Sequence, residues 1–178
     1  YDIEQSLRFD DGDSAYLGRT FSAGDTTEWT FSCWVKRGNA TDSGASRKIF
    51  GAYIDGSNIS DINFYDNQSI ACSEHVGGST VAALYTNAVY RDYSAWYHIV
   101  VVWDSDNGTS GDRYRLYVNG DRVTDFSTET QPSSAQASAT NAAGTHNVGK
   151  QNSDEYYDGY LAEVHFIDGT ALDASSFG

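Results

Sequence analysis

Residues 29–36 read Trp-Thr-Phe-Ser-Cys-Trp-Val-Lys, and this stretch decides the fold class. Its apolar side chains Trp29, Phe31, Cys33 and Val35 recur at every second position. Successive side chains of a strand point to opposite faces of a sheet, so a period of two predicts a strand with one buried face. A helix would instead repeat its apolar residues every three or four positions, and that pattern is nearly absent from the chain.

The same alternation continues on both sides of this stretch. We predict further strands over residues 7–9, 49–54, 62–65, 81–90, 96–103, 114–118, 121–123 and 160–167. Asn119-Gly120 separates two of them and predicts a tight hairpin, because both residues tolerate positive φ. The polar segment 131–144 is long for a loop, and Asp173 is placed to cap one helical turn. About ten short strands with few helices predict an all-β, antiparallel two-sheet jelly-roll sandwich.

Acidic residues outnumber basic residues by 25 to 11, which gives a net charge of -14. Nucleic acids and anionic membranes attract basic patches, so we expect neither of them to be a partner. The longest apolar run, residues 99–103, is far too short to cross a bilayer, so we expect no membrane insertion. Asp accounts for 19 of the acidic residues and Glu for 6. Since Asp favours turns and Glu favours helices, this charge belongs to polar loops.

Two further features of the composition concern cysteine and methionine. Cys33 and Cys72 are too few for a disulfide framework. We predict two small buried residues, with a single bridge between them as the alternative. The chain contains no Met, which we interpret as the mark of a processed subunit or of a module carried on a longer chain.

Three segments, in chain order, resemble the concanavalin A-like jelly rolls of the laminin-G and pentraxin type. They are residues 29–36, residues 96–104 with 115–120, and residues 158–166. The resemblance implies that residues 1–178 form a single laminin-G-like domain, with the first and last strands side by side in one sheet. The ending, residues 166–173, resembles domains in structural proteins of marine bacteriophages.

An enzyme hypothesis arises because the same fold hosts laminarinase-type glucanases. Retaining glycosidases need two carboxylates about 5–5.5 Å apart. Those glucanases place their acids on one strand, as Glu-x-Asp-x-x-Glu, and this chain has no such string. In the nearest match, Glu163 to Asp168, the second acid falls on the wrong face of a strand. We therefore predict no enzyme and no catalytic residues, with Glu163 and His165 as solvated residues on an outer face.

The pentraxin resemblance implies a calcium site on one sheet face, although no cofactor is required. Its expected ligands are Asn58, Asp61, Gln151, Asn152 and Asp154. Oxygen ligands of this kind suit Ca²⁺, but the Asp-Asn pair of the pentraxin pattern is not reproduced around Asp61. Separately, residues 10–13 (Asp-Asp-Gly-Asp) predict a turn, with a metal site as the alternative.

Aromatic rings next to amides suggest a sugar site, because sugar C–H faces pack on rings while amides bond the hydroxyls. The predicted ligand-binding residues are Asn152, Asp154, Tyr156 and Tyr157. Adjacent residues of a strand point to opposite faces, so only one of the two tyrosines can line a given site.

The sequence therefore predicts a non-enzymatic structural or binding module on the surface of a phage virion, in a tail, fibre or capsid. Its expected role is attachment to host-surface glycans or particle assembly, with other virion or surface-protein subunits as partners and an oligomeric state. The alternative is a carbohydrate-binding or adhesin domain of a bacterial extracellular protein, outside the cell or on its surface. A glycoside hydrolase is the third hypothesis.

Overall fold

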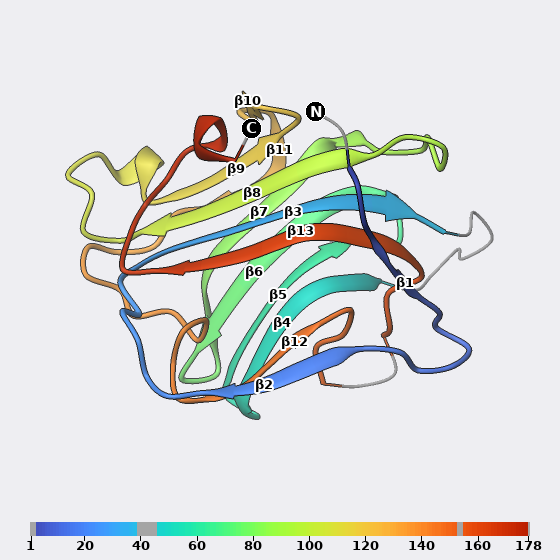
Figure 1. Ribbon diagram of the computed structural model, residues 1–178. Helices are drawn as coiled ribbons and strands as arrows, with labels where there is room; N and C mark the ends of the chain where they lie inside the picture. The colour runs from blue at the N-terminus through green and yellow to red at the C-terminus, as the bar shows by residue number, and fades with distance from the viewer. Residues whose placement is uncertain (1–2, 39–45, 153–154, 178) are drawn as a thin grey trace.

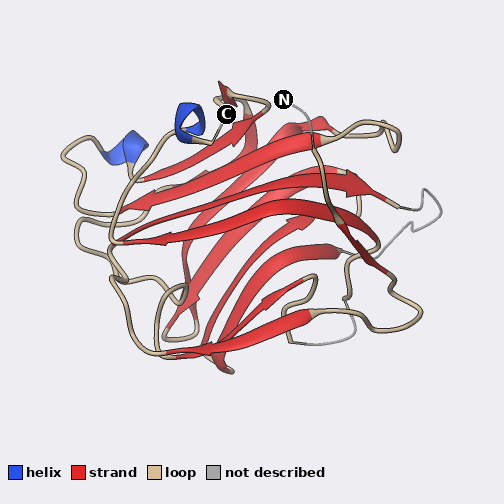
Figure 2. Cartoon of the chain, in the orientation of Figure 1, coloured by secondary structure: helices blue, strands red, loops and turns tan. Residues whose placement is uncertain are grey.

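Two antiparallel sheets that face each other make up the fold, as Figures 1 and 2 show. The computed structural model describes residues 3–38, 46–152 and 155–177. Strands account for nearly all of the regular structure in these residues, with two short 3₁₀ helices, η1 (Ser110–Asp112) and η2 (Ala174–Ser176). No helix among the described residues is long and apolar enough to cross a membrane.

The six-stranded sheet contains the stretch from which the fold was predicted. In spatial order its strands are β1 (Leu7–Phe9), β13 (Gly159–Asp168), β3 (Glu28–Arg37), β8 (Tyr97–Asp104), β9 (Tyr114–Val118) and β10 (Asp121–Arg122). The first and last strands pair directly, with Leu7 opposite Leu161, as the laminin-G resemblance implied.

The seven-stranded sheet packs against it. In spatial order its strands are β11 (Phe126–Thr130), β7 (Ser79–Val89), β6 (Ser69–Val76), β5 (Asn58–Phe64), β4 (Arg47–Asp55), β12 (Gly144–Val148) and β2 (Leu17–Phe21). This arrangement confirms the predicted all-β jelly-roll sandwich. Strand β12 arrives from far along the chain and inserts between β4 and β2, which places residues 144–148 beside residues 17–21 and 50–53.

The core lies between the sheets and begins with the predicted alternation of β3. Trp29, Phe31, Cys33 and Val35 are all buried and point inward. They meet buried side chains of the opposite sheet, such as Phe50, whose ring stacks on Phe31 at a centroid distance of 4.7 Å. Burying one large apolar side chain contributes about 1.5–3 kcal/mol, so this layer supplies much of the driving force for folding.

Local predictions about turns and caps are also confirmed. Asn119 and Gly120 have φ values of 53° and 88°, which is the backbone that a tight primed hairpin turn between β9 and β10 requires. The Asp173 carboxylate accepts a hydrogen bond from the Ser175 amide at 3.0 Å and caps η2. Both cysteines are free and fully buried, so the two-thiol prediction holds and the alternative of a bridge is wrong.

Four strands were given no bounds by prediction, namely β2, β6, β11 and β12, although the stretch around Cys72 in β6 is strand-like in sequence. Three of them, with the sequences LGRTF, FSTET and GTHNV, contain few apolar residues. The fourth, β6, has an apolar alternation that Glu74 interrupts at an inward position. Polar strands of this kind form because their backbone pairs with neighbours, and side-chain rhythm does not reveal that pairing.

Glu74 fixes the long polar segment 131–143 against the core. Its buried carboxylate accepts hydrogen bonds from the Ala139 amide at 2.8 Å and from the Thr140 hydroxyl at 2.6 Å. In the same loop, Ser138 Oγ accepts a hydrogen bond from the Trp29 indole at 2.8 Å. The segment predicted as a loop is therefore a loop, and buried polar contacts fix its middle part to both sheets.

Candidate functional site

A polar and aromatic pocket lies on the outer face of the seven-stranded sheet, beside β12. Thr145 pairs with Tyr53, and Asn147 pairs with Gly51. Because the intervening Ala52 and His146 are buried on the core side, these four residues point outward. The pocket measures about 180 Å³, and we call it the β12 pocket; it is lined by Tyr16, Tyr53, Thr145, Asn147, Lys150, Gln151 and Asn152.

Lys150 lies between two tyrosine rings at this pocket. Its Nζ is 4.3 Å from the ring centroid of Tyr16 and 4.9 Å from that of Tyr156. The same atom donates a hydrogen bond to the Tyr156 hydroxyl at 3.2 Å. Cation–π contacts of this kind contribute about 0.5–1 kcal/mol at exposed sites, so the two rings hold the ammonium in place.

Amide groups form the floor of the pocket. Asn147 is only 4% exposed, and its Nδ2 donates a hydrogen bond to the Gln151 carbonyl at 2.7 Å. Its Oδ1 is buried and has no hydrogen-bond partner among the described residues. The floor thus contains a buried acceptor that lacks a donor, a state that folded proteins rarely tolerate.

A glycine allows the chain after β12 to lie flat on the sheet. A Cβ added at Gly51 would come within 2.7 Å of Gln151 Cβ and Cγ and within 2.9 Å of its Cα. Real Cβ atoms do not approach other atoms so closely, so Gly51 is required for Gln151 to pack there. The shape of the β12 pocket therefore depends on a residue that contributes no side chain to it.

The structure separates the residues predicted to bind a ligand. Gln151 and Asn152 line the β12 pocket, and Tyr156 lies beside it against Lys150. Asp154 lies outside the described residues. The prediction that Tyr157 binds a ligand needs correction, because its side chain is 0% exposed. Burial also raises the pKa of Tyr157 well above the usual value for a tyrosine.

Tyr157 belongs to the core because the chain alternates at this point. Its ring packs edge-on against Phe9, and its hydroxyl donates a hydrogen bond to the Lys36 carbonyl at 2.8 Å. Tyr156 points to the other side, as the alternation of adjacent residues required.

Two of the residues expected to hold calcium, Asn58 and Asp61, already have other partners. Asn58 stands at the tip of the β4–β5 hairpin, where its Nδ2 donates to Asp55 and its Oδ1 accepts from the Gly77 amide. Asp61 forms an ion pair with Lys48 at 3.0 Å. Because an ammonium already occupies that carboxylate, it is poorly suited to a second cation. Calcium binding through this set stays a prediction, since Asp154 is outside the described residues.

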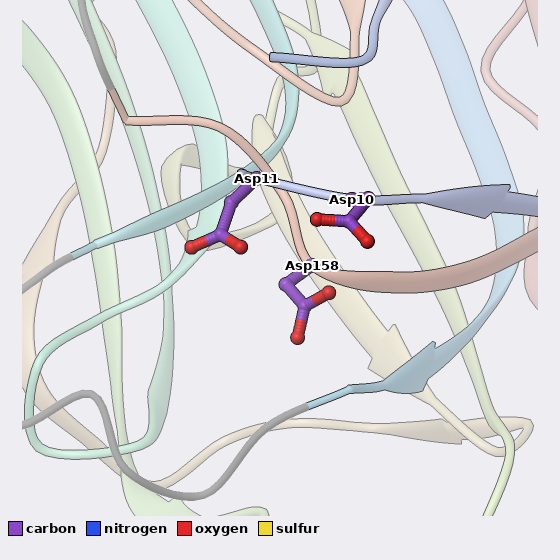
Figure 3. Close-up of side chains that lie close together, drawn as sticks. All are labelled: Asp10, Asp11 and Asp158. Atoms are coloured by element: carbon purple, nitrogen blue, oxygen red, sulfur yellow. The ribbon is translucent and has the colours of Figure 1, made fainter. Parts of the chain in front are cut away.

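A group of three carboxylates forms elsewhere, where β1 meets the start of β13. Figure 3 shows Asp10, Asp11 and Asp158, whose carboxylate oxygens lie within 4.8 Å of one another. Burial and the neighbouring Asp11 raise the pKa of Asp158. Two arginines offset the other two acids, since Arg47 lies 3.0 Å from Asp11 and Arg8 lies 3.4 Å from Asp10.

Residues 10–14 form the turn that the sequence predicted. The Ser14 amide donates to the Asp11 carbonyl at 3.1 Å, and the Gly12 amide donates to the Asp10 carboxylate at 3.0 Å. The turn therefore explains the spacing of these acids without a metal. The structure adds Asp158 to the group, which no local pattern could have indicated.

The residues closest to a glycosidase pattern have structural partners. Glu163 lies 3.6 Å from His165, and both side chains are well exposed, as predicted. Glu163 has a φ of 48°, because β13 contains a bulge between Ala162 and His165. At the end of the same strand, the Asp168 carboxylate accepts a hydrogen bond from the Asp25 amide at 2.8 Å. Glu163 and Asp168 thus make local structural contacts, one with His165 and the other with the Asp25 amide.

Sequence reasoning missed most of the β12 pocket. Tyr16, Tyr53, Thr145, Asn147 and Lys150 come from three separate segments of the chain. Only the proximity of residues 150–156 was visible in the sequence, as a polar stretch followed by two tyrosines. The other residues of the pocket reach this stretch because β12 pairs with both β4 and β2. Strand β12 itself was not predicted.

Solved structures share this fold at low sequence identity. Domains LG4-5 of the mouse laminin α1 chain match with a TM-score of 0.65 and 10% identity, over 96% of this chain and 44% of that one. The native heptameric SAP-like pentraxin of Limulus polyphemus matches with a TM-score of 0.57 and 17% identity, over 85% and 68%. The Ruminococcus gnavus IT-sialidase CBM40 bound to α2,3 sialyllactose matches with a TM-score of 0.55 and 12% identity, over 92% and 96%.

The family comparison agrees with this likeness of fold. A search of curated protein sequences gives no match. A family model described as the concanavalin A-like lectin/glucanases superfamily matches residues 9–176, which is nearly the whole chain. The chain therefore belongs to the concanavalin A-like lectin/glucanases superfamily, in its laminin-G-like branch.

Proposed function

We propose that this chain is a glycan-binding module without catalytic activity and that the β12 pocket holds the sugar. The observation that carries the proposal is the composition of the pocket. Tyrosine rings, a hydroxyl and three amides converge there on the outer face of a sheet. Rings offer apolar faces for sugar C–H groups, and amides both donate to and accept from hydroxyls.

The dimensions of the pocket support a small part of a glycan as the ligand. Its volume of about 180 Å³ is below the range of about 300–1,000 Å³ that is typical of drug-sized ligands. We therefore propose that it holds one or two sugar units at the end of a longer glycan. Tyr16 is 48% exposed at the rim, where it can contact a further unit.

Two other cavities suit a glycan less well. The larger one, of about 420 Å³, lies at the open edge of the sandwich and is mainly apolar, with Leu7, Leu17 and Val164 exposed around it. A second, of about 410 Å³, is lined by Arg8, Lys36, Arg37, Tyr93, Asp158 and Tyr160. Neither offers the three side-chain amides of the β12 pocket, since the first has only Gln5 and the second has none.

The test is binding to a printed glycan array with the wild type, Tyr53→Ala and Asn152→Ala. Losing an aromatic anchor of a binding site costs about 1–2 kcal/mol, so we expect roughly tenfold weaker binding for Tyr53→Ala. Tyr93→Ala is the matched control, because Tyr93 lies in the loop after β7, away from the β12 pocket. Equal binding by all four proteins would rule out this pocket as the glycan site.

We also propose where the module acts and that it has no catalytic activity. We propose attachment on a virion surface, as the resemblance of residues 166–173 implied, or on a bacterial surface protein, with self-association or particle assembly as a further role. A non-enzyme releases no reducing ends from laminarin-type glucans, so measurable release would contradict the absence of catalysis. Calorimetry with Ca²⁺, read as heat and as a change in melting temperature, tests the calcium prediction separately.

A further inference from the structure

We propose that the glycan bound in the β12 pocket carries an acidic group, a carboxylate or a sulfate ester, and that the Lys150 ammonium binds this group. The inference rests on the proposed function and names its substrate class.

Lys150 stands out from the neighbouring cations because it lacks an ionic partner. In β4, Lys48 lies 3.0 Å from Asp61 and 3.3 Å from Glu155, and Arg47 lies 3.0 Å from Asp11. No carboxylate among the described residues lies within ion-pair distance of Lys150.

The contacts that Lys150 does make leave its charge available. The rings of Tyr16 and Tyr156 attract the ammonium through their faces but carry no negative charge. An ammonium has three N–H donors, and the Tyr156 hydroxyl accepts one of them. No other hydrogen bond of this ammonium forms with the described residues, so its other N–H groups can donate to an anionic oxygen.

The rest of the pocket supplies what a sugar needs beside its acidic group. Thr145 and Asn152 line the same cavity and offer a hydroxyl and an amide. Gln151 lines it as well and offers a second amide. The Lys150 ammonium and these polar groups thus occur in one cavity, where a single acidic sugar can contact both.

The acidic surface of the chain does not prevent this binding. Charges in solution are screened over about 8 Å at physiological ionic strength. A ligand in the β12 pocket therefore responds mainly to Lys150, and the remote acids lower the association rate rather than the final affinity.

The test uses matched glycan pairs that differ only in charge. Uronic-acid oligosaccharides are compared with their methyl esters, and sulfated oligosaccharides with their desulfated counterparts. We expect the wild type to bind at least one acidic member roughly tenfold more tightly than its neutral counterpart. The two sets of pairs distinguish a carboxylate ligand from a sulfate ligand.

Three variants assign the preference to Lys150. Lys150→Met keeps the aliphatic stem between the two rings and removes the charge, so the ratio of acidic to neutral binding falls to about one. Lys150→Arg keeps the charge and retains a preference for the acidic member. Lys36→Met makes the same change in net charge at the far end of β3 and leaves the ratio as in the wild type. Melting temperatures show that each variant is folded.

The outcomes separate this inference from the function on which it rests. Binding to neutral glycans without any acidic preference would overturn the inference and leave the glycan-binding function intact. An acidic preference that survives in Lys150→Met would overturn the role of Lys150. Binding to no glycan at any protein concentration tested would overturn the function and the inference together.

Discussion

At the scale of single residues, this chain buries a carboxylic acid in its core. The Glu74 side chain points to the same side of β6 as Ile70 and Cys72, toward the core, and is buried. Burial raises its pKa to about 8, although hydrogen bonds from the Thr140 hydroxyl and the Ala139 amide act in the opposite direction. Desolvation of a charge therefore outweighs two well-formed hydrogen bonds at this position.

The raised pKa of Glu74 predicts a pH-dependent stability. Its unfolded pKa is 4.5 and its folded pKa is about 8, so the folded state binds the proton more tightly. The stabilising contribution is complete below pH 4.5 and is lost as the pH rises through about 8. Glu74→Gln removes this titration. We expect the melting temperatures of wild type and variant to agree near pH 4.5, to diverge between pH 4.5 and about pH 8, and to stay apart above that, with the variant higher.

The comparison with the variant also controls for the histidines. Burial lowers the pKa of His98 and of His146, so both cost stability when they are protonated in acid. Their effect occurs in both proteins and cancels in the difference between the two curves. Parallel curves across this range would show that Glu74 stays ionised in the folded state.

At the scale of elements, the β12 pocket exists because one segment lies flat on two strands. Residues 149–152 leave β12 and turn back over β4, where Gly51 leaves room for Gln151. The Gly149 amide donates to the Ile49 carbonyl at 2.8 Å, which fixes the start of this segment. The pocket is thus a product of strand pairing and of a missing side chain.

Gly51→Ala tests this arrangement. The new Cβ would overlap the Gln151 side chain and backbone, and overpacking of this kind costs about 1–3 kcal/mol. We expect glycan binding to fall by more than tenfold, because Gln151, Asn152 and Lys150 are displaced together. Gly56→Ala is the matched control, since a Cβ there meets nothing within 4 Å. A Gly51→Ala protein that binds like the control would show that the segment is not fixed by this contact.

The elements also show what a sequence can and cannot reveal. The alternation of Trp29, Phe31, Cys33 and Val35 identifies β3 because one of its faces lies in the core. The sequence GTHNV of β12 identifies nothing, although this strand joins β4 to β2 and builds the candidate site. Prediction therefore reached the core and the hairpins, whose signals are local. It found only Gln151 and Asn152 of the site, because the rest depends on pairing across about 90 residues to β4 and about 125 residues to β2.

At the scale of the whole molecule, one thiol of each sheet lies in the core between the sheets. Cys33 belongs to the six-stranded sheet and Cys72 to the seven-stranded sheet, and both are fully buried. Burial raises the pKa of both thiols far above the usual value, so neither is a reactive thiolate while the sheets are together. Access to either thiol requires the two sheets to separate.

Thiol labelling therefore reports on the cooperativity of the sandwich. We expect a thiol reagent to leave the native protein unlabelled and to modify Cys33 and Cys72 at one common rate as denaturant is added. That rate should follow global unfolding, because no smaller opening exposes a core formed by both sheets. Mass spectrometry of the separate peptides measures the two rates in the wild type, without any substitution in the core. If Cys72 were labelled faster and with a weaker dependence on denaturant, the seven-stranded sheet would open by itself. The two sheets would then be separate cooperative units, and the β12 pocket could be lost while the six-stranded sheet stays folded.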